Sequence, residues 1–281
     1  MKLLRYGDKG AERPGLLDAA GRIRALSGEI GDLGGAALAP DRLRQLAALA
    51  PESLPLVESE PRLGPCVGNV GKFICIGLNY ADHAAEAGMP IPDEPVVFLK
   101  ATSSISGPND PVLMPVGGSK LDWEAELAVV IGSAGRNIPE AEALEHVAGY
   151  CVVNDVSERA FQLERNGQWA KGKSADSFGP IGPWLVTRDE VPDSQALDIW
   201  LEVDGTRRQN GNTRTMIFPV PYLVSYVSQF MSLQPGDVIA TGTPPGVGLG
   251  QKPQPIFLEA GQVVRLGVHG LGEQRQEIRA A

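Results

Sequence analysis

Residues 120–131 read Lys-Leu-Asp-Trp-Glu-Ala-Glu-Leu-Ala-Val-Val-Ile, and this stretch carries the clearest signal of fold in the chain. Asp122, Glu124 and Glu126 alternate with apolar residues. Because successive side chains of a β-strand point to opposite faces, the three carboxylates are expected on one face and the apolar groups on the other. The run continues as Leu-Ala-Val-Val-Ile, which predicts a strand that enters the core rather than a solvated edge.

The same three carboxylates suggest a metal site. Like charges on one face of a strand repel, and near a core they are not expected all to stay ionised unless a cation accompanies them. Ligands that are all oxygen suit a hard ion such as Mg²⁺, Mn²⁺ or Ca²⁺. The alternative is a solvent-facing strand whose acids keep the edge of a sheet soluble. Residues 120–131 alone leave both interpretations open.

Short β-branched runs alternate with Gly/Pro turns from Lys72 onward. The runs are KFICIGL, PVVFLK, ELAVVIG, GYCVVND, GPWLVT, LDIWLEV, GDVIATG and QVVRLGV. Helical patterns are few, chiefly 81–87, 139–147 and 220–231. Many short strands with few helices predict the α+β class, a β-rich rolled sheet, over a parallel α/β fold. Nucleotide binding lacks its main support, because no GxGxxG follows a strand and no GxxxxGK[ST] is present.

The first 65 residues have a different texture and predict a small N-terminal domain, with residues 66–281 as the catalytic domain. Leu16-Leu17 and residues 23–26 flank a turn-like Asp-Ala-Ala-Gly, which predicts a hairpin. Pro40-Asp41 then opens a segment whose leucines at 43, 46 and 49 have helical spacing. A proline-rich stretch over residues 51–65 follows and is interpreted as a linker.

Composition excludes several classes of partner. The chain has 281 residues, a formal net charge of −9 and a pI near 5.0. Nucleic acids and anionic membranes are recognised by clustered Lys and Arg, so neither is an expected partner. The three cysteines form no CxxC pair, and two of them stand in apolar runs typical of buried reduced thiols. Without an apolar signal region or a stretch long enough to span a membrane, a cytoplasmic protein is expected.

A further acid follows a second core-type run. Cys151-Val152-Val153 ends abruptly in Asn154-Asp155. An acid at the end of a core strand is well placed to complete a metal site with Glu124 and Glu126. Asp155 could equally be the N-cap of a helix that begins at Val156-Ser157-Glu158.

The histidine with the strongest functional signal is His83. It stands three residues before Glu86 in a short helical segment that Asn79 could cap, so the two side chains share one helix face. A carboxylate that touches imidazole fixes its tautomer and makes it a base able to activate water. Gly77, Gly88 and the prolines that follow fit a short helical lid between loops. On spacing alone, an ordinary surface ion pair is the simpler explanation.

Two lysines and a threonine complete the candidates. Lys100 ends the run Val-Val-Phe-Leu-Lys, and Lys173 lies among glycines, where it could hold an anion or an enolate with Asp176 orienting it. Thr243 follows the strand Val238-Ile-Ala, where backbone N–H groups and hydroxyls could hold a carboxylate. Exposed loop lysines and an ordinary Gly/Pro turn are the alternatives.

Taken together, these residues resemble the fumarylacetoacetate hydrolase family over about residues 70–270. The motifs that carry the resemblance stand in order: Ile76-Gly-Leu-Asn-Tyr80 with His83 and Glu86, Phe98-Leu-Lys100, Asp122-Trp-Glu124-Ala-Glu126-Leu, Asn154-Asp155, Gly172-Lys173-Ser-Ala-Asp176-Ser-Phe-Gly-Pro-Ile-Gly-Pro183 and Gly236-Asp237-Val-Ile-Ala-Thr-Gly-Thr-Pro-Pro-Gly246. The fold implied is the family's mixed β-roll, behind a small and variable N-terminal α/β segment, usually in a homodimer.

The resemblance also assigns roles. It implies that Glu124, Glu126 and Asp155 ligate one Mg²⁺ or Mn²⁺, that His83 and Glu86 form a water-activating dyad on a lid, and that Lys173 stabilises developing charge. The candidate substrate contacts are Lys100, Arg159, Gln162, Asp176 and Thr243.

The implied activity is hydrolysis of the C3–C4 bond of a 2,4-diketo acid to pyruvate and a carboxylic acid. The substrate would be an acylpyruvate or a 2,4-diketo-3-deoxy sugar acid, such as the L-rhamnonate or L-fuconate derivative. The same metal cradle could serve an oxaloacetate decarboxylase or a 2-keto acid hydratase or isomerase. A non-catalytic metal- or ligand-binding protein is a further alternative, although it would not need a His–Glu pair.

Overall fold

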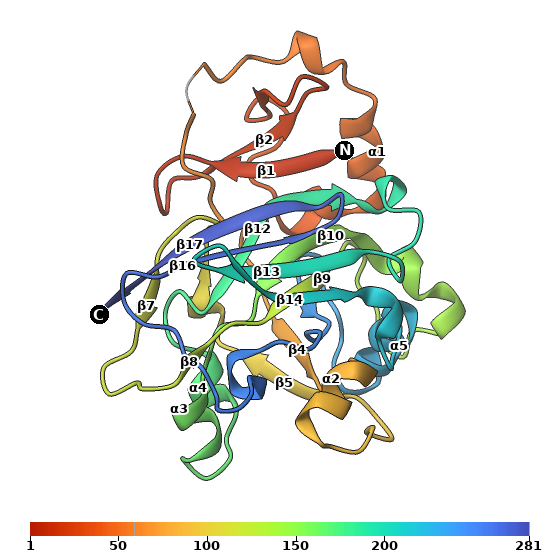
Figure 1. The fold of residues 1–281 in the computed structure, drawn as a ribbon. Coiled ribbons are helices and arrows are strands. Elements are labelled where there is room, and N and C mark those ends of the chain that lie inside the picture. The colour runs from red at the N-terminus through yellow and green to blue at the C-terminus, as the bar shows by residue number, and fades with distance from the viewer. Residues whose placement is uncertain (59, 281) are drawn as a thin grey trace.

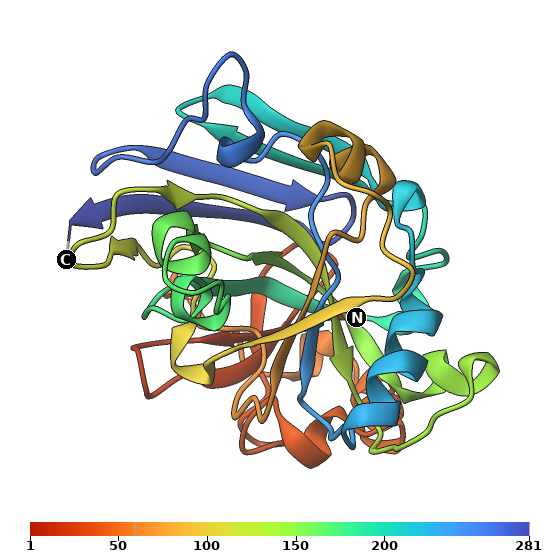
Figure 2. The same cartoon turned by 90° about the horizontal axis from the view of Figure 1, so that it is seen from below.

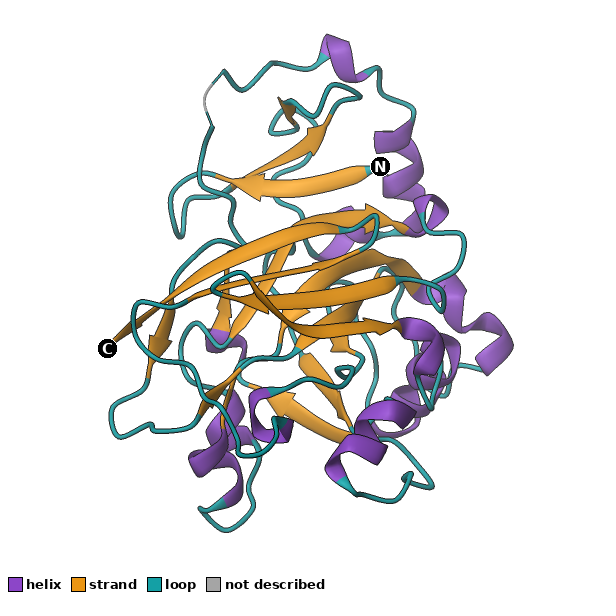
Figure 3. Ribbon diagram, viewed as in Figure 1, coloured by secondary structure: helices purple, strands orange, loops and turns teal. Residues whose placement is uncertain are grey.

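The computed structural model describes residues 1–58 and 60–280 and is built around one large mixed sheet (Figures 1 and 3). Ten strands form this sheet. In spatial order they are β3 (Ile23–Ala25), β2 (Arg13–Leu17), β1 (Lys2–Tyr6), β12 (Gly179–Thr187), β10 (Val147–Asn154), β9 (Ala125–Ile131), β15 (Val238–Ala240), β4 (Phe73–Gly77) and β5 (Val96–Lys100), with β6 (Ile105–Ser106) paired to β12.

A second sheet packs across the first, so the strands form two layers (Figure 2). Its order is β14 (Thr206–Asn212), β13 (Asp198–Val203), β16 (Val263–Val268), β17 (Gly272–Ala280) and β7 (Val112–Met114). A separate pair, β8 (Leu121–Asp122) and β11 (Ser157–Glu158), lies beside the layers. Strand-rich layers with short helices confirm the predicted α+β class and the β-roll.

The sequence of β9 is apolar on both faces because both faces of this strand are buried. Leu127, Val129 and Ile131 belong to the core between the two sheets, whereas Ala128 and Val130 belong to the core on the opposite face. Neighbouring strands β10 and β15 pair with β9 on either side. A central strand that is covered on both faces gains burial from every side chain, which is why the alternation seen in residues 120–126 disappears after Leu127.

The helices are short and lie at the edges of the sheets. They are α1 (Pro40–Ala47), α2 (Ala81–Ala87), α3 (Arg159–Leu163), α4 (Ala170–Lys173) and α5 (Val220–Phe230), with 3₁₀ turns η1 (Gly35–Leu38), η2 (Pro51–Ser53), η3 (Thr102–Ser104), η4 (Glu140–His146), η5 (Arg188–Glu190), η6 (Thr213–Thr215) and η7 (Gly248–Gly250). The expected helices at 81–87 and 220–231 are confirmed, and the one at 139–147 is a 3₁₀ segment. Among the described residues, no helix is long and apolar enough to cross a membrane.

The N-terminal segment extends the main sheet. The predicted hairpin is confirmed as β2 paired with β3, and β1 continues the sheet by pairing with β12. Leu43 and Leu46 of α1 are buried, and they join a core that also contains Cys151 of β10. Residues 1–65 therefore share a sheet and a core with the rest of the chain, and their division from residues 66–281 as a separate domain stays a prediction.

One expectation about residues 120–131 is wrong, because the strand is interrupted at Trp123 and Glu124. Side-chain amide oxygens replace ladder partners at this point: the N–H of Glu124 donates to Asn154 Oδ1 at 3.1 Å, and that of Ala125 donates to Gln209 Oε1 at 2.9 Å. The break turns Asp122 away from the face that it was expected to share with Glu124 and Glu126.

Candidate active site

Three buried carboxylates meet where β9 begins and β10 ends. Glu126 lies in β9 opposite Val153, Glu124 immediately precedes β9, and Asp155 immediately follows β10. The register is held by the N–H of Asp155, which donates to the carbonyl of Glu124 at 2.9 Å. One oxygen from each carboxylate lies within 4.8 Å of the others. The structure thus brings together the three residues predicted as metal ligands.

Cations surround two of these carboxylates. Lys173 Nζ lies 3.0 Å from Glu124 Oε2 and 2.7 Å from Asp155 Oδ2, and Arg159 Nη2 lies 2.7 Å from Glu124 Oε1. Burial alone would raise the pKa of Glu124, but Lys173 and Arg159 lower it to about 2. Lys100 Nζ contacts Asp155 Oδ1 at 2.5 Å. Glu124 and Asp155 are therefore neutralised by the chain's own side chains.

The surroundings of Glu126 differ from those of Glu124 and Asp155. Its Oε2 accepts a hydrogen bond from the N–H of Gly242 at 2.8 Å, and among the described residues it has no salt-bridge partner. Burial raises the pKa of Glu126 well above its usual value, and the charges of Asp155 and Glu124 raise it further. Glu126 is thus a buried carboxylate that lies beside two others and is not neutralised by a salt bridge within the described residues. A bound cation would balance its negative charge.

The donor set fits a hard divalent cation. All three groups offer oxygen atoms, which is the ligand type that Mg²⁺ and Mn²⁺ take in proteins. Glu124, Glu126 and Asp155 are the residues that would hold such an ion.

Lys173 owes its position to a close contact between two helices. A Cβ on Gly172 of α4 would lie 2.5 Å from the backbone N of Gln162 in α3 and 2.5 Å from the carbonyl oxygen of Glu158. Glycine at 172 therefore lets α4 pack directly on α3 and directs the next residue, Lys173, into the carboxylate cluster. The side chain of Lys173 is 2% exposed, so it is not the solvated loop lysine of the alternative interpretation.

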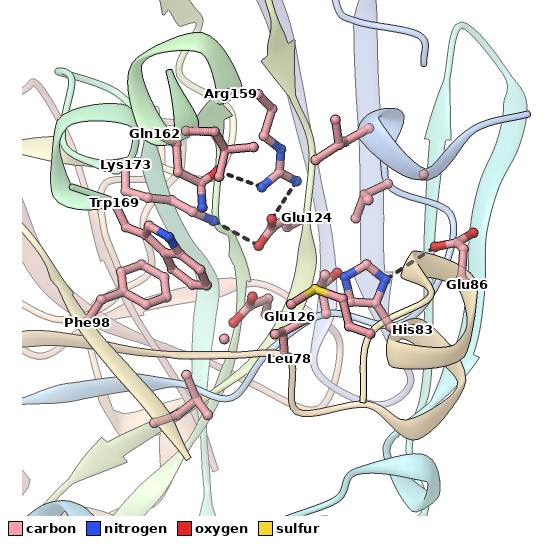
Figure 4. A pocket seen from close by; sticks show the side chains of 18 of the residues that line it. Leu78, His83, Glu86, Phe98, Glu124, Glu126, Arg159, Gln162, Trp169 and Lys173 are labelled. Atoms are coloured by element: carbon pink, nitrogen blue, oxygen red, sulfur yellow. Dashed lines mark hydrogen bonds and ion pairs between the residues drawn. The ribbon is translucent and has the colours of Figure 1, made fainter. Parts of the chain in front are cut away.

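His83 and Glu86 lie in α2, across the site from Lys173. In Figure 1 both helical groups lie at the bottom of the molecule, α3 with α4 to the left and α2 to the right. His83 Nδ1 lies 3.2 Å from Glu86 Oε2, and both Glu86 oxygens accept the N–H of Gly246 at 3.1 Å. In Figure 4, Glu124 and Glu126 stand between this pair and the Lys173 side.

One cavity of about 350 Å³ joins these groups. Its lining residues are Ile76, Gly77, Leu78, His83, Glu86, Met89, Phe98, Glu124, Glu126, Arg159, Gln162, Leu163, Trp169, Lys173, Thr243, Val247, Leu249, Gly250 and Lys252. The volume lies at the small end of the range of ligand pockets. A small molecule that fills this cavity would touch both the carboxylates and the His83–Glu86 pair.

The predicted substrate contacts fall into two groups. Arg159, Gln162 and Thr243 line the cavity. Lys100 is buried behind it, where its Nζ contacts Asp155 and the carbonyl of Val156. Asp176 is exposed in a turn and does not line the cavity, and the groups that hold Lys173 are Glu124 and Asp155 instead.

Residues 72–279 match the family model described as fumarylacetoacetate (FAA) hydrolase C-terminal. The chain belongs to the fumarylacetoacetate hydrolase family. A Burkholderia cenocepacia protein provisionally named a hydrolase is 68% identical, with 100% of both chains covered. Two solved structures also cover 100% of each chain: fumarylacetoacetate hydrolase from Exiguobacterium antarcticum (36% identity, TM-score 0.86) and maleylpyruvate hydrolase from Sphingobium sp. SYK-6 in complex with manganese(II) and pyruvate (28%, 0.82).

In this fumarylacetoacetate hydrolase family member, Asp122 has a position that strand alternation did not predict. Its carboxylate accepts hydrogen bonds from Arg159 Nε at 2.8 Å, from the N–H of Gly248 at 2.6 Å and from the N–H of Leu249 at 3.0 Å. Asp122 thus ties the loop that carries η7 to an arginine of the cavity wall. The residues around Asp122 in the sequence do not indicate these contacts, because the partners are distant in the chain.

Replacing Asp122 by asparagine should weaken this tie. Asparagine keeps one acceptor oxygen but loses the charge that pairs with Arg159 and the second acceptor. We expect the free energy of unfolding to fall by about 2 kcal/mol, as for other hydrogen bonds to charged groups. Urea unfolding measures the change, with exposed Asp189→Asn as the matched control, expected to change it by less than about 0.5 kcal/mol. Equal stability of the two variants would contradict the role given to Asp122.

Two further residues of the cavity wall, Trp169 and Phe98, were not predicted from their own residue types. Their rings meet edge to face, with centroids 5.3 Å apart. An isolated tryptophan in a polar loop has no periodic pattern around it, so only the folded contacts reveal its place.

Proposed function

We propose that the chain is a divalent-metal-dependent hydrolase that cleaves the C3–C4 bond of an acylpyruvate-type 2,4-diketo acid. The products are pyruvate and the carboxylic acid derived from the acyl group. The observation that carries this proposal is the single cavity lined by both Glu124 and Glu126 of the carboxylate cluster and the His83–Glu86 pair. The similarity to a maleylpyruvate hydrolase solved with manganese(II) and pyruvate adds support.

His83 would act as the general base. Its Nδ1 faces Glu86, which favours the tautomer with the proton on Nδ1 and leaves Nε2 to accept a proton from water. The resulting hydroxide adds to C4, the C3–C4 bond breaks, and the electron pair passes to the pyruvyl half. The proton returned to C3 forms the methyl group of pyruvate, so water is divided between the two products.

Cationic side chains would stabilise the negative charge that develops during this sequence. Lys173 and Arg159 are buried beside Glu124 and line the cavity, where a low dielectric strengthens their interaction with an anionic substrate. A divalent ion held by Glu124, Glu126 and Asp155 would supply Lewis-acid stabilisation of charge at the keto-acid end.

The His83–Glu86 pair separates this function from decarboxylation and from a binding role. Decarboxylation of oxaloacetate requires no activated water, and a binding protein requires no base. A 2-keto acid hydratase or isomerase would use the same carboxylates, so the distinction must come from products. The homodimer implied by the family resemblance stays a prediction, and the substrate panel below decides whether a sugar-derived acid is cleaved.

The test is pyruvate release from a panel of acids. Metal-stripped protein is incubated with acetylpyruvate, longer acylpyruvates, a 2,4-diketo-3-deoxy sugar acid and oxaloacetate, each with Mg²⁺, Mn²⁺ or EDTA. We expect pyruvate from at least one diketo acid, dependent on the added metal and abolished by EDTA. Pyruvate from oxaloacetate alone would replace the proposal with decarboxylation. Isomerised substrate without cleavage, or no turnover of any member, would overturn hydrolysis.

A further inference from the structure

An aromatic wall bounds the cavity on the side of Lys173 (Figure 4). The ring of Trp169 meets that of Phe98 edge to face, with an interplanar angle of 69°. Trp169 also lies directly on the backbone of β4, since a Cβ on Gly77 would be 2.6 Å from its Cζ3 atom. The indole is therefore fixed from two sides, by an aromatic edge and by a strand that has no side chain at that point.

Several polar side chains of the cavity already have hydrogen-bond or ion-pair partners within the protein. Arg159 donates to Asp122 and to Gln162 Oε1, and Lys173 contacts Glu124. The hydroxyl of Thr243 donates to the carbonyl of Ala125 and accepts from Gln209. Among the described lining residues, the side-chain donors left for a ligand beyond the groups that the proposed reaction uses are the Gln162 amide, the indole N–H of Trp169 and the ammonium of Lys252.

Apart from Lys252, the rest of the lining is apolar. Besides the two aromatic residues, it consists of Ile76, Leu78, Met89, Leu163, Val247 and Leu249, together with glycines. Among the described lining residues, Lys252 is the one lysine or arginine without a carboxylate partner, and its side chain is exposed. A polyhydroxylated chain would leave hydroxyls unpaired against these walls, which costs free energy.

We propose that Trp169, backed by Phe98 and Gly77, binds the acyl substituent and makes the enzyme selective for acylpyruvates with an apolar or aromatic acyl group. This inference rests on the proposed hydrolysis. It assigns Trp169 as a specificity-determining residue and places sugar-derived diketo acids among the poor substrates.

The size of the selectivity follows from apolar burial. Each methylene group that passes from water into an apolar pocket should raise kcat/KM by about fourfold. A phenyl group placed against Trp169 should gain a further few-fold from the edge-to-face or stacked contact. Across the series acetyl-, butanoyl- and benzoylpyruvate, we expect kcat/KM to rise by at least about tenfold in total.

The experiment compares wild type with Trp169→Ala across that series plus one diketo acid with a terminal carboxylate and one derived from a deoxy sugar. We expect Trp169→Ala to reduce kcat/KM for benzoylpyruvate by roughly tenfold or more while leaving acetylpyruvate within about twofold. Trp169→Phe should retain most of the selectivity. The matched control is Trp200→Ala, which removes a tryptophan of β13 that does not line the cavity and should not alter the ratio.

The outcomes separate this inference from the proposed function. Pyruvate from the terminal carboxylate or the sugar-derived acid in preference to the apolar series would overturn the inference and leave hydrolysis standing. Equal loss for acetyl- and benzoylpyruvate in Trp169→Ala, with a melting temperature like that of Trp200→Ala, would also overturn it, since the wall would then act on the shared pyruvyl half. Absence of pyruvate from every acid would instead reject the proposed function.

Discussion

Replacing His83 by alanine is expected to lower kcat for pyruvate release by about 100- to 10,000-fold, the usual contribution of a positioned general base. The imidazole lines the cavity, and its Nδ1 is engaged by Glu86 at 3.2 Å, so Nε2 remains to accept the proton of water. Metal affinity should stay nearly unchanged, because His83 is not part of the carboxylate cluster. Steady-state kinetics and titration of the metal-stripped variant by calorimetry measure the two quantities separately.

His146→Ala is the matched control for this variant. His146 ends η4, its Nδ1 lies 3.1 Å from the carbonyl oxygen of Ser133, and it does not line the cavity. The His146→Ala variant should keep the wild-type kcat. Glu86→Gln should lose part of the rate, since an amide can still contact the imidazole but carries no charge. If His83→Ala lost metal affinity and rate in equal proportion, His83 would be supporting the metal site rather than activating water.

The fold was predictable where one local rule decides the outcome. The run Leu-Ala-Val-Val-Ile predicts a strand in the core, and β9 is that strand, buried on both faces. The leucines of α1 and the turn between β2 and β3 follow equally local rules. Residues 140–146 pack against α5 and β1 pairs with β12, and these partners lie far along the chain, so residue patterns do not specify either arrangement.

The candidate site was predictable to the extent that residue type specifies chemistry. Glu124, Glu126 and Asp155 were grouped by charge and strand position, and the register of β9 with β10 brings them together. Asp122 has the same charge and the same spacing, yet the break before Ala125 directs it to Arg159. That break depends on Asn154 and Gln209, which accept the backbone N–H groups from other strands, so alternation alone could not reveal it.

The unequal charge environment of the carboxylates leads to the second large effect. Glu126→Gln and Glu124→Gln each replace one carboxylate of the cluster by a neutral amide of the same shape. Both should weaken binding of Mn²⁺ by at least about 100-fold, the upper end of what loss of a supporting group costs a metal site. Their effects on the metal-free protein should differ, because Glu124 pairs with Lys173 and Arg159 whereas Glu126 has no cationic partner among the described residues.

In the metal-free state, Glu124→Gln leaves two buried cations with one fewer partner, and we expect a loss of about 3 kcal/mol in the free energy of unfolding. Glu126→Gln removes a carboxylate that is buried beside two others, so stability should stay within about 1 kcal/mol of wild type or increase. Urea unfolding with EDTA measures the stability of the metal-free proteins, and unfolding with saturating Mn²⁺ measures how much the metal adds. The wild type should gain stability from the metal, and neither variant should gain as much. Equal destabilisation of the two metal-free variants would contradict the charge pairing drawn from the structure. A full metal-dependent gain in Glu126→Gln would show that the cation does not require this carboxylate, and the site would have to be assigned to other donors.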